Sequence, residues 1–102
     1  MANAFKSYQS TGITTETTVL TGPSGTETTV IGLSIANTSS SATANVDVKL
    51  NTAYIIKNGP IPVGGALVVV GGDQKLVVEA SDTIKVTSDS SVDVVTSTLE
   101  IT

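Results

Sequence analysis

The amino-acid sequence predicts an all-β protein, a single antiparallel β-sandwich of about eight strands. The chain of 102 residues contains 14 Val, 8 Ile and 17 Thr, and such branched side chains favour the extended backbone of a pleated sheet. Only 6 Leu are present, and Ala-rich or long charged runs are absent, so the sequence has little from which to build amphipathic helices. Segments of strand composition recur about every 8–12 residues with turn signals between them, a spacing typical of antiparallel sandwiches.

The length fits one domain, and the composition shows no second one. We expect residues 13–102 to form the sandwich domain. Residues 1–12 precede the first strong turn signal and are expected to form an N-terminal arm or an edge strand. The eight predicted strands cover residues 13–21, 26–38, 44–51, 53–57, 66–70, 75–80, 83–88 and 92–101. Jelly-roll and immunoglobulin-like strand orders are both compatible with this pattern.

The strand predicted at 44–51 has the clearest alternation. Apolar residues occupy every second position from Ala44 to Leu50, and polar residues lie between them. This period of two means that one face of the strand is buried and the other is solvated. In the strand at 26–38, Ile31, Leu33 and Ile35 fall on one face in the same way.

Gly, Pro and Asn mark the turns between the predicted strands. Pro23, in the segment GPSG, presets a turn between the first two strands. Asn58-Gly59 predicts a turn at the end of the fourth strand. Pro60 and Pro62 lack the N–H that a ladder needs, so the PIP segment is expected on an edge or in an extended crossing.

The last predicted strand does not keep a single apolar face. Val92 and Val94 lie on one face. Val95, Leu99 and Ile101 lie on the other. A bulge or a change of sheet near Val94 would explain this change of phase.

Two Gly-Gly pairs flank the apolar run ALVVV at 66–70. A phosphate-binding loop needs a spacing such as GxGxxG between a strand and a helix, and neither pair has it. Gly64-Gly65 and Gly71-Gly72 are therefore predicted to turn the chain. The GGDQ segment that begins at Gly71 is predicted to be a four-residue hairpin loop between the strands on either side.

The composition argues against an enzyme. The chain has no His, the usual general base and commonest metal ligand, and no Cys for thiol chemistry or structural zinc. A nucleophilic Ser would need Lys as its base, and nothing in the sequence marks one Ser above another. We therefore assign no catalytic, cofactor-binding or metal-ligating residue and expect no cofactor.

Calcium is the one metal that the sequence leaves open, because it takes oxygen ligands. The segment SDTIKVTSDSSVD supplies Asp82, Asp89 and Asp93, and Asp73 precedes it. The spacing is not that of an EF-hand loop. Asp in turns ordinarily caps its own backbone, and this interpretation is the favoured one.

The chain has three aromatic residues, fewer than sugar-binding or single-strand-binding surfaces usually carry. Tyr54 is expected to be a core or cross-strand residue beside Ile55. Phe5 and Tyr8 belong to the N-terminal segment, and they could anchor it either to its own subunit or to a neighbouring one.

Charge is sparse on this chain. It has five Lys, no Arg and nine acidic residues, a net charge of −4, so neither nucleic acid nor an anionic membrane is an expected partner. No signal peptide or membrane span is readable, and we expect a soluble protein. Charged residues make up 14% of the chain, against about 25% in typical soluble domains. We infer that copies of the chain or a larger lattice cover much of its surface in the working state.

Three segments carry a resemblance to a known family. They are TVIGLSIAN (29–37), KNGPIPVGG (57–65) followed by an apolar strand, and KLVVEASDTIKVTS (75–88). In this order, with a closing C-terminal strand, the chain resembles small virion proteins of tailed bacteriophages, particularly those of marine bacteria and cyanobacteria. The resemblance extends over residues 1–102.

The resemblance implies a non-enzymatic structural role in a virion assembled in the host cytoplasm. Its partners would be other virion proteins, such as the major capsid protein or tail and neck proteins, together with further copies of itself. We expect capsid decoration or cementing, because a compact single domain suits a clip at lattice junctions. The alternatives are a tail, neck or baseplate subunit and a receptor- or carbohydrate-binding module on the virion surface.

Overall fold

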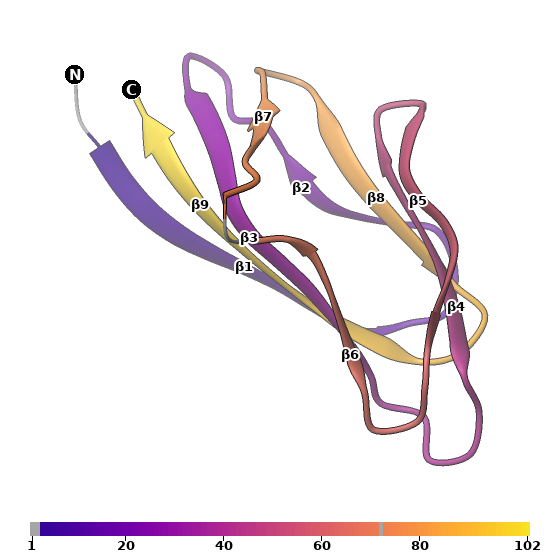
Figure 1. Ribbon diagram of the computed structural model, residues 1–102. Coiled ribbons are helices and arrows are strands. Elements are labelled where there is room, and N and C mark those ends of the chain that lie inside the picture. Colours follow the sequence, from indigo (N-terminus) through magenta and orange to yellow (C-terminus); the bar gives the residue numbers. More distant parts are fainter. Residues whose placement is uncertain (1–2, 72) are drawn as a thin grey trace.

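The computed structural model describes residues 3–71 and 73–102, and within them all regular structure is β-strand. The strands are β1 (Asn3–Ile13), β2 (Thr17–Thr21), β3 (Glu27–Asn37), β4 (Ala44–Leu50), β5 (Ala53–Ile61), β6 (Ala66–Val70), β7 (Leu76–Val78), β8 (Thr83–Ser88) and β9 (Val92–Ile101). They form two antiparallel sheets packed face to face (Figure 1). The prediction of an all-β sandwich is confirmed.

The strand order is nested. The five-stranded sheet has the order β1-β9-β3-β6, with β7 also paired to β3, and the four-stranded sheet has the order β2-β8-β4-β5. The first strand, β1, thus pairs with the last, β9, and the second, β2, pairs with β8. The middle strands of the sequence, β4 and β5, pair with each other. An immunoglobulin sandwich keeps its first two strands in one sheet, whereas here β1 and β2 lie in different sheets. The order is that of a jelly roll.

The predicted hairpin between β6 and β7 is wrong. Both strands pair antiparallel with β3, β6 along Leu33–Ala36 and β7 along Thr28–Val30. They are therefore two parts of one edge strand, interrupted by residues 71–75. A hairpin would have left Thr28–Val30 of β3 without a partner on this side, and β7 instead completes the ladder there.

Two predicted strand boundaries also change. The segment 13–21 is divided, because Ile13 pairs with Val92 in one sheet and Thr17 pairs with Val86 in the other. Residues between Ile13 and Thr17 carry the chain across the sandwich.

The fourth predicted strand does not end at Asn58-Gly59, since β5 continues through Pro60 to Ile61. Asn58, at φ 54°, kinks the strand rather than reversing it, and the register with β4 shifts beside it. Pro60 lies on the edge of the four-stranded sheet, where proline was expected.

The strand β9 neither changes sheet nor loses its alternation. Val92, Val94, Thr96, Thr98 and Glu100 point inward and are buried. The predicted irregularity lies on its partner: Ser10 pairs with Val94 and Ile13 with Val92, so the bulge is in β1. The apolar residues Val95, Leu99 and Ile101 are on the outside of the sheet.

The core lies between the two sheets and consists of branched aliphatic side chains. Ala44, Val46 and Val48 are fully buried, as the alternation in this strand predicts. In β3, Leu33 and Ile35 are buried as predicted, but Val30 takes the inward position expected of Ile31. The reason is a register shift between Val30 and Gly32.

Candidate interaction surface

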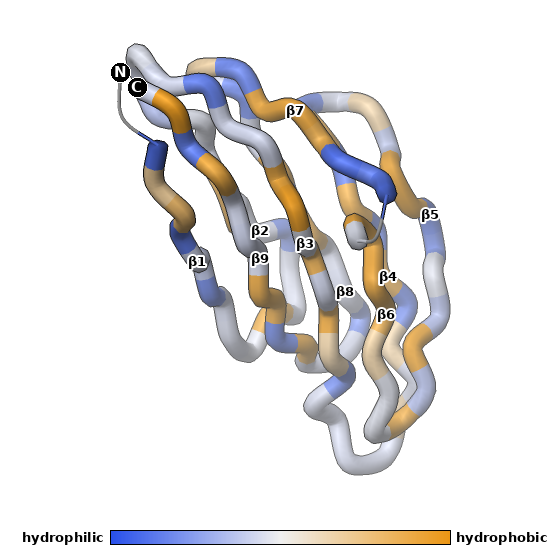
Figure 2. The backbone as a smooth tube through the Cα atoms, turned by 60° about the vertical axis from the view of Figure 1, so that its left-hand side comes forward, coloured by the Kyte–Doolittle hydropathy of each residue, from blue (hydrophilic) through white to orange (hydrophobic). Residues whose placement is uncertain are grey.

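The outward side of the five-stranded sheet carries a row of apolar side chains. Phe5 pairs with Leu99, Leu99 with Thr29, and Thr29 with Val77, so one row crosses β1, β9, β3 and β7. Phe5 is 76% exposed and Val77 is 63% exposed. Figure 2 shows hydrophobic segments of β9, β3 and β7 on neighbouring strands of this sheet.

A second row crosses the same side. Val95 pairs with Gln9 on one side and with Ser34 on the other, and Ser34 pairs with Val68. Val68 is 67% exposed and Val95 is 44% exposed. We call the apolar side chains of these two rows, together with Ile101 on the same side of β9, the outer apolar face. Its members are Phe5, Val68, Val77, Val95, Leu99 and Ile101.

This face has little charge. Its strands contribute Glu27, opposite Ile101, and Asp93, opposite Ala36, at opposite ends of the sheet. Four lysines lie elsewhere, Lys6 on the inward side of β1 and Lys49, Lys57 and Lys85 on the four-stranded sheet, and Lys75 is exposed just before β7, at the margin of this face. An apolar face of this kind, without a ring of cations, is typical of a surface that another protein covers.

The outward side of the four-stranded sheet is different. Lys49 pairs with Lys85 on β8 and with Tyr54 on β5, and its Nζ lies 2.8 Å from Glu16 Oε2. Hydrogen bonding to Lys49 lowers the pKa of Glu16. Lys57 Nζ stands 4.4 Å from the centre of the Tyr54 ring, a cation–π contact. Tyr54 is therefore a cross-strand residue, one of the two alternatives expected for it, on a charged and solvated side.

Glu100 ties β1 to the rest of the sandwich from the inward side. Its side chain is almost completely buried, and its Oε2 accepts hydrogen bonds from the Tyr8 hydroxyl and from Thr98 Oγ1 at 3.2 Å. Lys6 Nζ lies 3.6 Å from Glu100 Oε1. The hydrogen bond to Glu100, then burial, raises the pKa of Tyr8 to about 12.

The two aromatic residues of the N-terminal segment thus have different roles. Tyr8 anchors β1 to its own subunit, and Phe5 on the opposite side of the strand is exposed. Glu100 is not among the residues predicted to have a role. Its position in the inward phase of Val92 and Val94 was the available signal, because a carboxylate on a buried face needs partners.

The aspartates considered for calcium lie apart. Asp82 and Asp89 flank β8, so they are about 20 Å from each other. Asp82 accepts hydrogen bonds from Glu79 N at 3.1 Å and Asn51 Nδ2 at 3.0 Å. Asp93, on the other sheet, accepts one from Gly12 N at 3.0 Å.

Asp89 accepts hydrogen bonds from Asn45 N at 2.8 Å and from Asn45 Nδ2 at 3.0 Å, and the side-chain bond contributes most to lowering its pKa. Asp73 is exposed in the loop before β7. The carboxylates of Asp82, Asp89 and Asp93 brace loops and strand ends. Residues 3–71 and 73–102 contain no group of three acidic, His or Cys side chains that could hold a metal.

Three of the paired glycines, Gly64, Gly65 and Gly71, lie at described turns or strand ends. Gly65 N donates to Pro62 O at 2.9 Å, and Gly64, at φ 75°, closes this turn before β6. The predicted turn here is confirmed. At the second pair, Gly71 O accepts a hydrogen bond from Gln74 N at 3.2 Å, and Gly72 lies outside the described residues.

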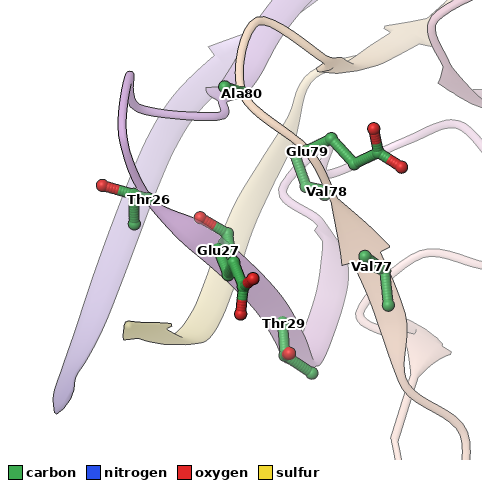
Figure 3. A pocket seen from close by; sticks show the side chains of 8 residues that line it. Thr26, Glu27, Thr29, Val77, Val78, Glu79 and Ala80 are labelled. Carbon is green, nitrogen blue, oxygen red and sulfur yellow. The ribbon is translucent and has the colours of Figure 1, made fainter. Parts of the chain in front are cut away.

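A hollow of about 490 Å³ lies along β3 and β7, at the edge of the outer apolar face. It is lined by Thr26, Glu27, Thr28, Thr29, Val77, Val78, Glu79 and Ala80. In Figure 3 the carboxylates of Glu27, on β3, and Glu79, just after β7, point away from one another. The lining contains two carboxylates and three threonine hydroxyls, but among the described residues no hydrogen bond joins one of these carboxylates to one of these hydroxyls. We assign no site to this hollow.

Comparison with protein-family models, with curated proteins and with solved structures finds no match for this chain. Within residues 3–71 and 73–102, no helix has the length and apolar character needed to cross a membrane.

Proposed function

We propose that this chain is a non-enzymatic structural protein of a tailed-bacteriophage virion, and that within the virion it decorates or cements the capsid. The observation that carries the structural role is the outer apolar face. Four of its side chains on the strands β1, β6, β7 and β9 are between 44% and 76% exposed. A free monomer rarely leaves such a set uncovered on one side of a sheet.

The chemistry of the face suits repeated, modest contacts. Phe5 is its one aromatic residue, and interface hot spots are enriched in Trp, Tyr and Arg. A single copy would then bind weakly, but copies held at regular intervals on a lattice gain avidity. Attachment of many copies to a symmetric shell fits this surface better than recognition of one partner.

The placement in a phage virion rests on the sequence resemblance of the segments 29–37, 57–65 and 75–88. In the fold these segments form most of β3, the kinked edge β5 with the turn after it, and β7 with β8. The jelly roll is also an architecture that capsid domains use, which is a likeness of fold alone.

The experiment is binding to particles that lack the protein. Stripped or deletion-mutant particles are incubated with native protein, with Val95→Lys or with Val68→Lys, and the bound amount is measured after sedimentation. Both changes place a cation on the outer apolar face and should reduce binding. Thr87→Lys, on the outward side of the four-stranded sheet opposite Asp47, is the matched control and should bind as the native protein does.

Copy number and heat stability separate the locations. A capsid subunit should be present in many copies per particle, and its removal should lower the temperature at which heads release DNA. A few copies per particle would move the assignment to the tail, neck or baseplate. Equal binding of all variants would contradict the structural role of this face.

A further inference from the structure

We propose that two copies of this chain associate through β1, whose free edges pair antiparallel about a two-fold axis and join the two five-stranded sheets into one. This inference deepens the proposed function by naming a second copy as a partner. It rests on that function only in placing the dimer in a virion. The association itself is a property of the isolated protein.

The strand β1 is the one long, regular edge among the described strands. Residues Asn3 to Ser10 pair with β9 in unbroken register. The other edges are each interrupted: β2 has five residues and a register shift, β5 has Pro60 and two shifts, and β6 and β7 have five and three residues separated by a loop. Short, bulged or proline-containing edges resist pairing with another chain, and β1 lacks these protections over eight residues.

The charge on β1 is already compensated within the subunit. Lys6 is its one charged residue, and an inward-pointing lysine can guard an edge against pairing. Here Lys6 Nζ lies 3.6 Å from Glu100 Oε1 of the same chain. The outward-pointing residues Phe5, Ser7 and Gln9 are uncharged.

The outer apolar face argues for a second copy as the partner at the β1 edge. Its most exposed side chain, Phe5, lies on the edge strand β1, so the apolar row extends to the edge of the sheet. Opposite residues of antiparallel strands share a face, so a two-fold axis perpendicular to the sheet, between the two β1 strands, sets the outward residues of both copies side by side. The two outer apolar faces then become one surface of double width.

The positions of Lys6 limit the register. Placing Lys6 opposite Lys6 of the second copy sets like charges together, which is unfavourable. The neighbouring registers of the same parity place Lys6 opposite Ala4 or opposite Tyr8. In the first, Phe5 lies opposite Phe5, and in the second, Ser7 lies opposite Ser7.

Sedimentation velocity over micromolar to millimolar concentrations tests the dimer. Native protein should dimerise, and Phe5→Lys should weaken the dimer by about tenfold or more, because in either register it places a cation within the contact. Val63→Lys, an equally simple change at a half-exposed residue in the turn before β6, should leave the dimer unchanged. A native monomer throughout the range, or equal effects of both changes, overturns the proposal.

Single cysteines locate the contact, since the native chain contains none. Either Phe5→Cys or Ser7→Cys should form an intermolecular disulfide rapidly under mild oxidation, according to the register. Ala53→Cys, exposed on the edge strand β5, is the control and should cross-link slowly. Equal rates at Ala53 overturn pairing through β1.

The failures of the two proposals are distinguishable. A protein that is monomeric in solution but binds particles through the outer apolar face overturns only the dimer, including the case in which β1 takes a strand from another virion protein. A β1 dimer that does not bind particles overturns only the proposed function.

Discussion

At the scale of single residues, Glu100 shows how a polar group can be placed inside an aliphatic sandwich. A buried carboxylate is costly unless its oxygens are hydrogen-bonded and its charge is compensated. Tyr8, Thr98 and Lys6 provide these partners, and two of them lie on β1. Close to them, the buried hydroxyls of Thr28 and Thr96 have no hydrogen-bond partner in the described residues. This end of the inward side is therefore polar, and two of its buried hydroxyls make no hydrogen bond within the described part of the chain.

Tyr8→Phe should reduce the free energy of unfolding by about 1.5–3 kcal/mol, because a buried charged acceptor loses a donor while the ring is kept. Tyr54→Phe is the matched control, since Tyr54 is half exposed on the other sheet and should change stability by about 0.5 kcal/mol or less. Urea titrations followed by circular dichroism give both values. Equal effects would mean that the hydrogen bond from the Tyr8 hydroxyl to Glu100 does not stabilise the fold.

The raised pKa of Tyr8 predicts a loss of stability in alkali. Below pH 10.0, the ordinary pKa, the phenol is protonated in both states and its contribution is complete. Between pH 10.0 and about 12 the unfolded chain loses this proton and the folded chain keeps it, so the free energy of unfolding falls as pH rises. Tyr8→Phe should show a smaller fall in this window. Parallel curves for the two proteins would contradict the assignment.

At the scale of elements, the sheets are locked together by short contacts between their connections. The turn between β2 and β3 meets the chain between β7 and β8: Gly22 N donates to Asp82 O at 2.8 Å, and Ser81 N donates to Gly22 O at 3.0 Å. A Cβ at position 22 would overlap the carbonyl oxygen of Glu79. This contact fixes the end of the sandwich near the chain termini.

Gly22→Ala should therefore destabilise the protein by about 2–3 kcal/mol, because a backbone carbonyl cannot move aside as a side chain can. Gly32→Ala is the control: a Cβ at Gly32 in β3 would make contacts of 3.9 Å or more, and alanine should be neutral or stabilise by about 0.4–1 kcal/mol. Thermal unfolding measures both. Similar losses in the two variants would argue against the steric explanation.

At the scale of the whole molecule, the nested order places the two chain ends side by side. Asn3 pairs with Ile101, and Figure 1 shows the start of β1 next to the end of β9. The strands β1 and β9 are separated by most of the sequence, so their pairing is non-local, and non-local pairing slows folding.

A circular permutant that joins the termini by a short Gly/Ser linker and opens the chain between Ser40 and Ser41 should fold faster than the native protein. The linker turns β1 and β9 into a local hairpin, whereas the opened connection joins β3 and β4, which lie in different sheets and do not pair. Stopped-flow refolding compares the rates. A permutant that folds more slowly would show that the connection from β3 to β4 directs folding.

Much of the architecture could be predicted from the sequence because it depends on local chemistry. Branched side chains, period-two alternation from Ala44 to Leu50 and the bounds 83–88 and 92–101 all reflect how one strand meets one buried face. Proline at position 60 confined β5 to an edge for an equally local reason.

The candidate interaction surface could be predicted only in part. Low charge predicts a covered surface. The apolar phase of Val95, Leu99 and Ile101, however, predicts a bulge or a change of sheet near Val94, and neither is found in β9. The residues were correctly placed on a second face, and only the pairing of β9 with β1 and β3 shows that this face is outward.

The sequence by itself determined that this protein is made of strands, how its best strands alternate and how little charge it exposes, because these properties follow from each residue and its near neighbours. The tertiary structure alone decided the jelly-roll order, the continuation of β6 into β7 along β3, and the meeting of Tyr8 with Glu100. These features are set by hydrogen-bonded pairing between strands far apart in the chain, and no local pattern encodes which strands will meet.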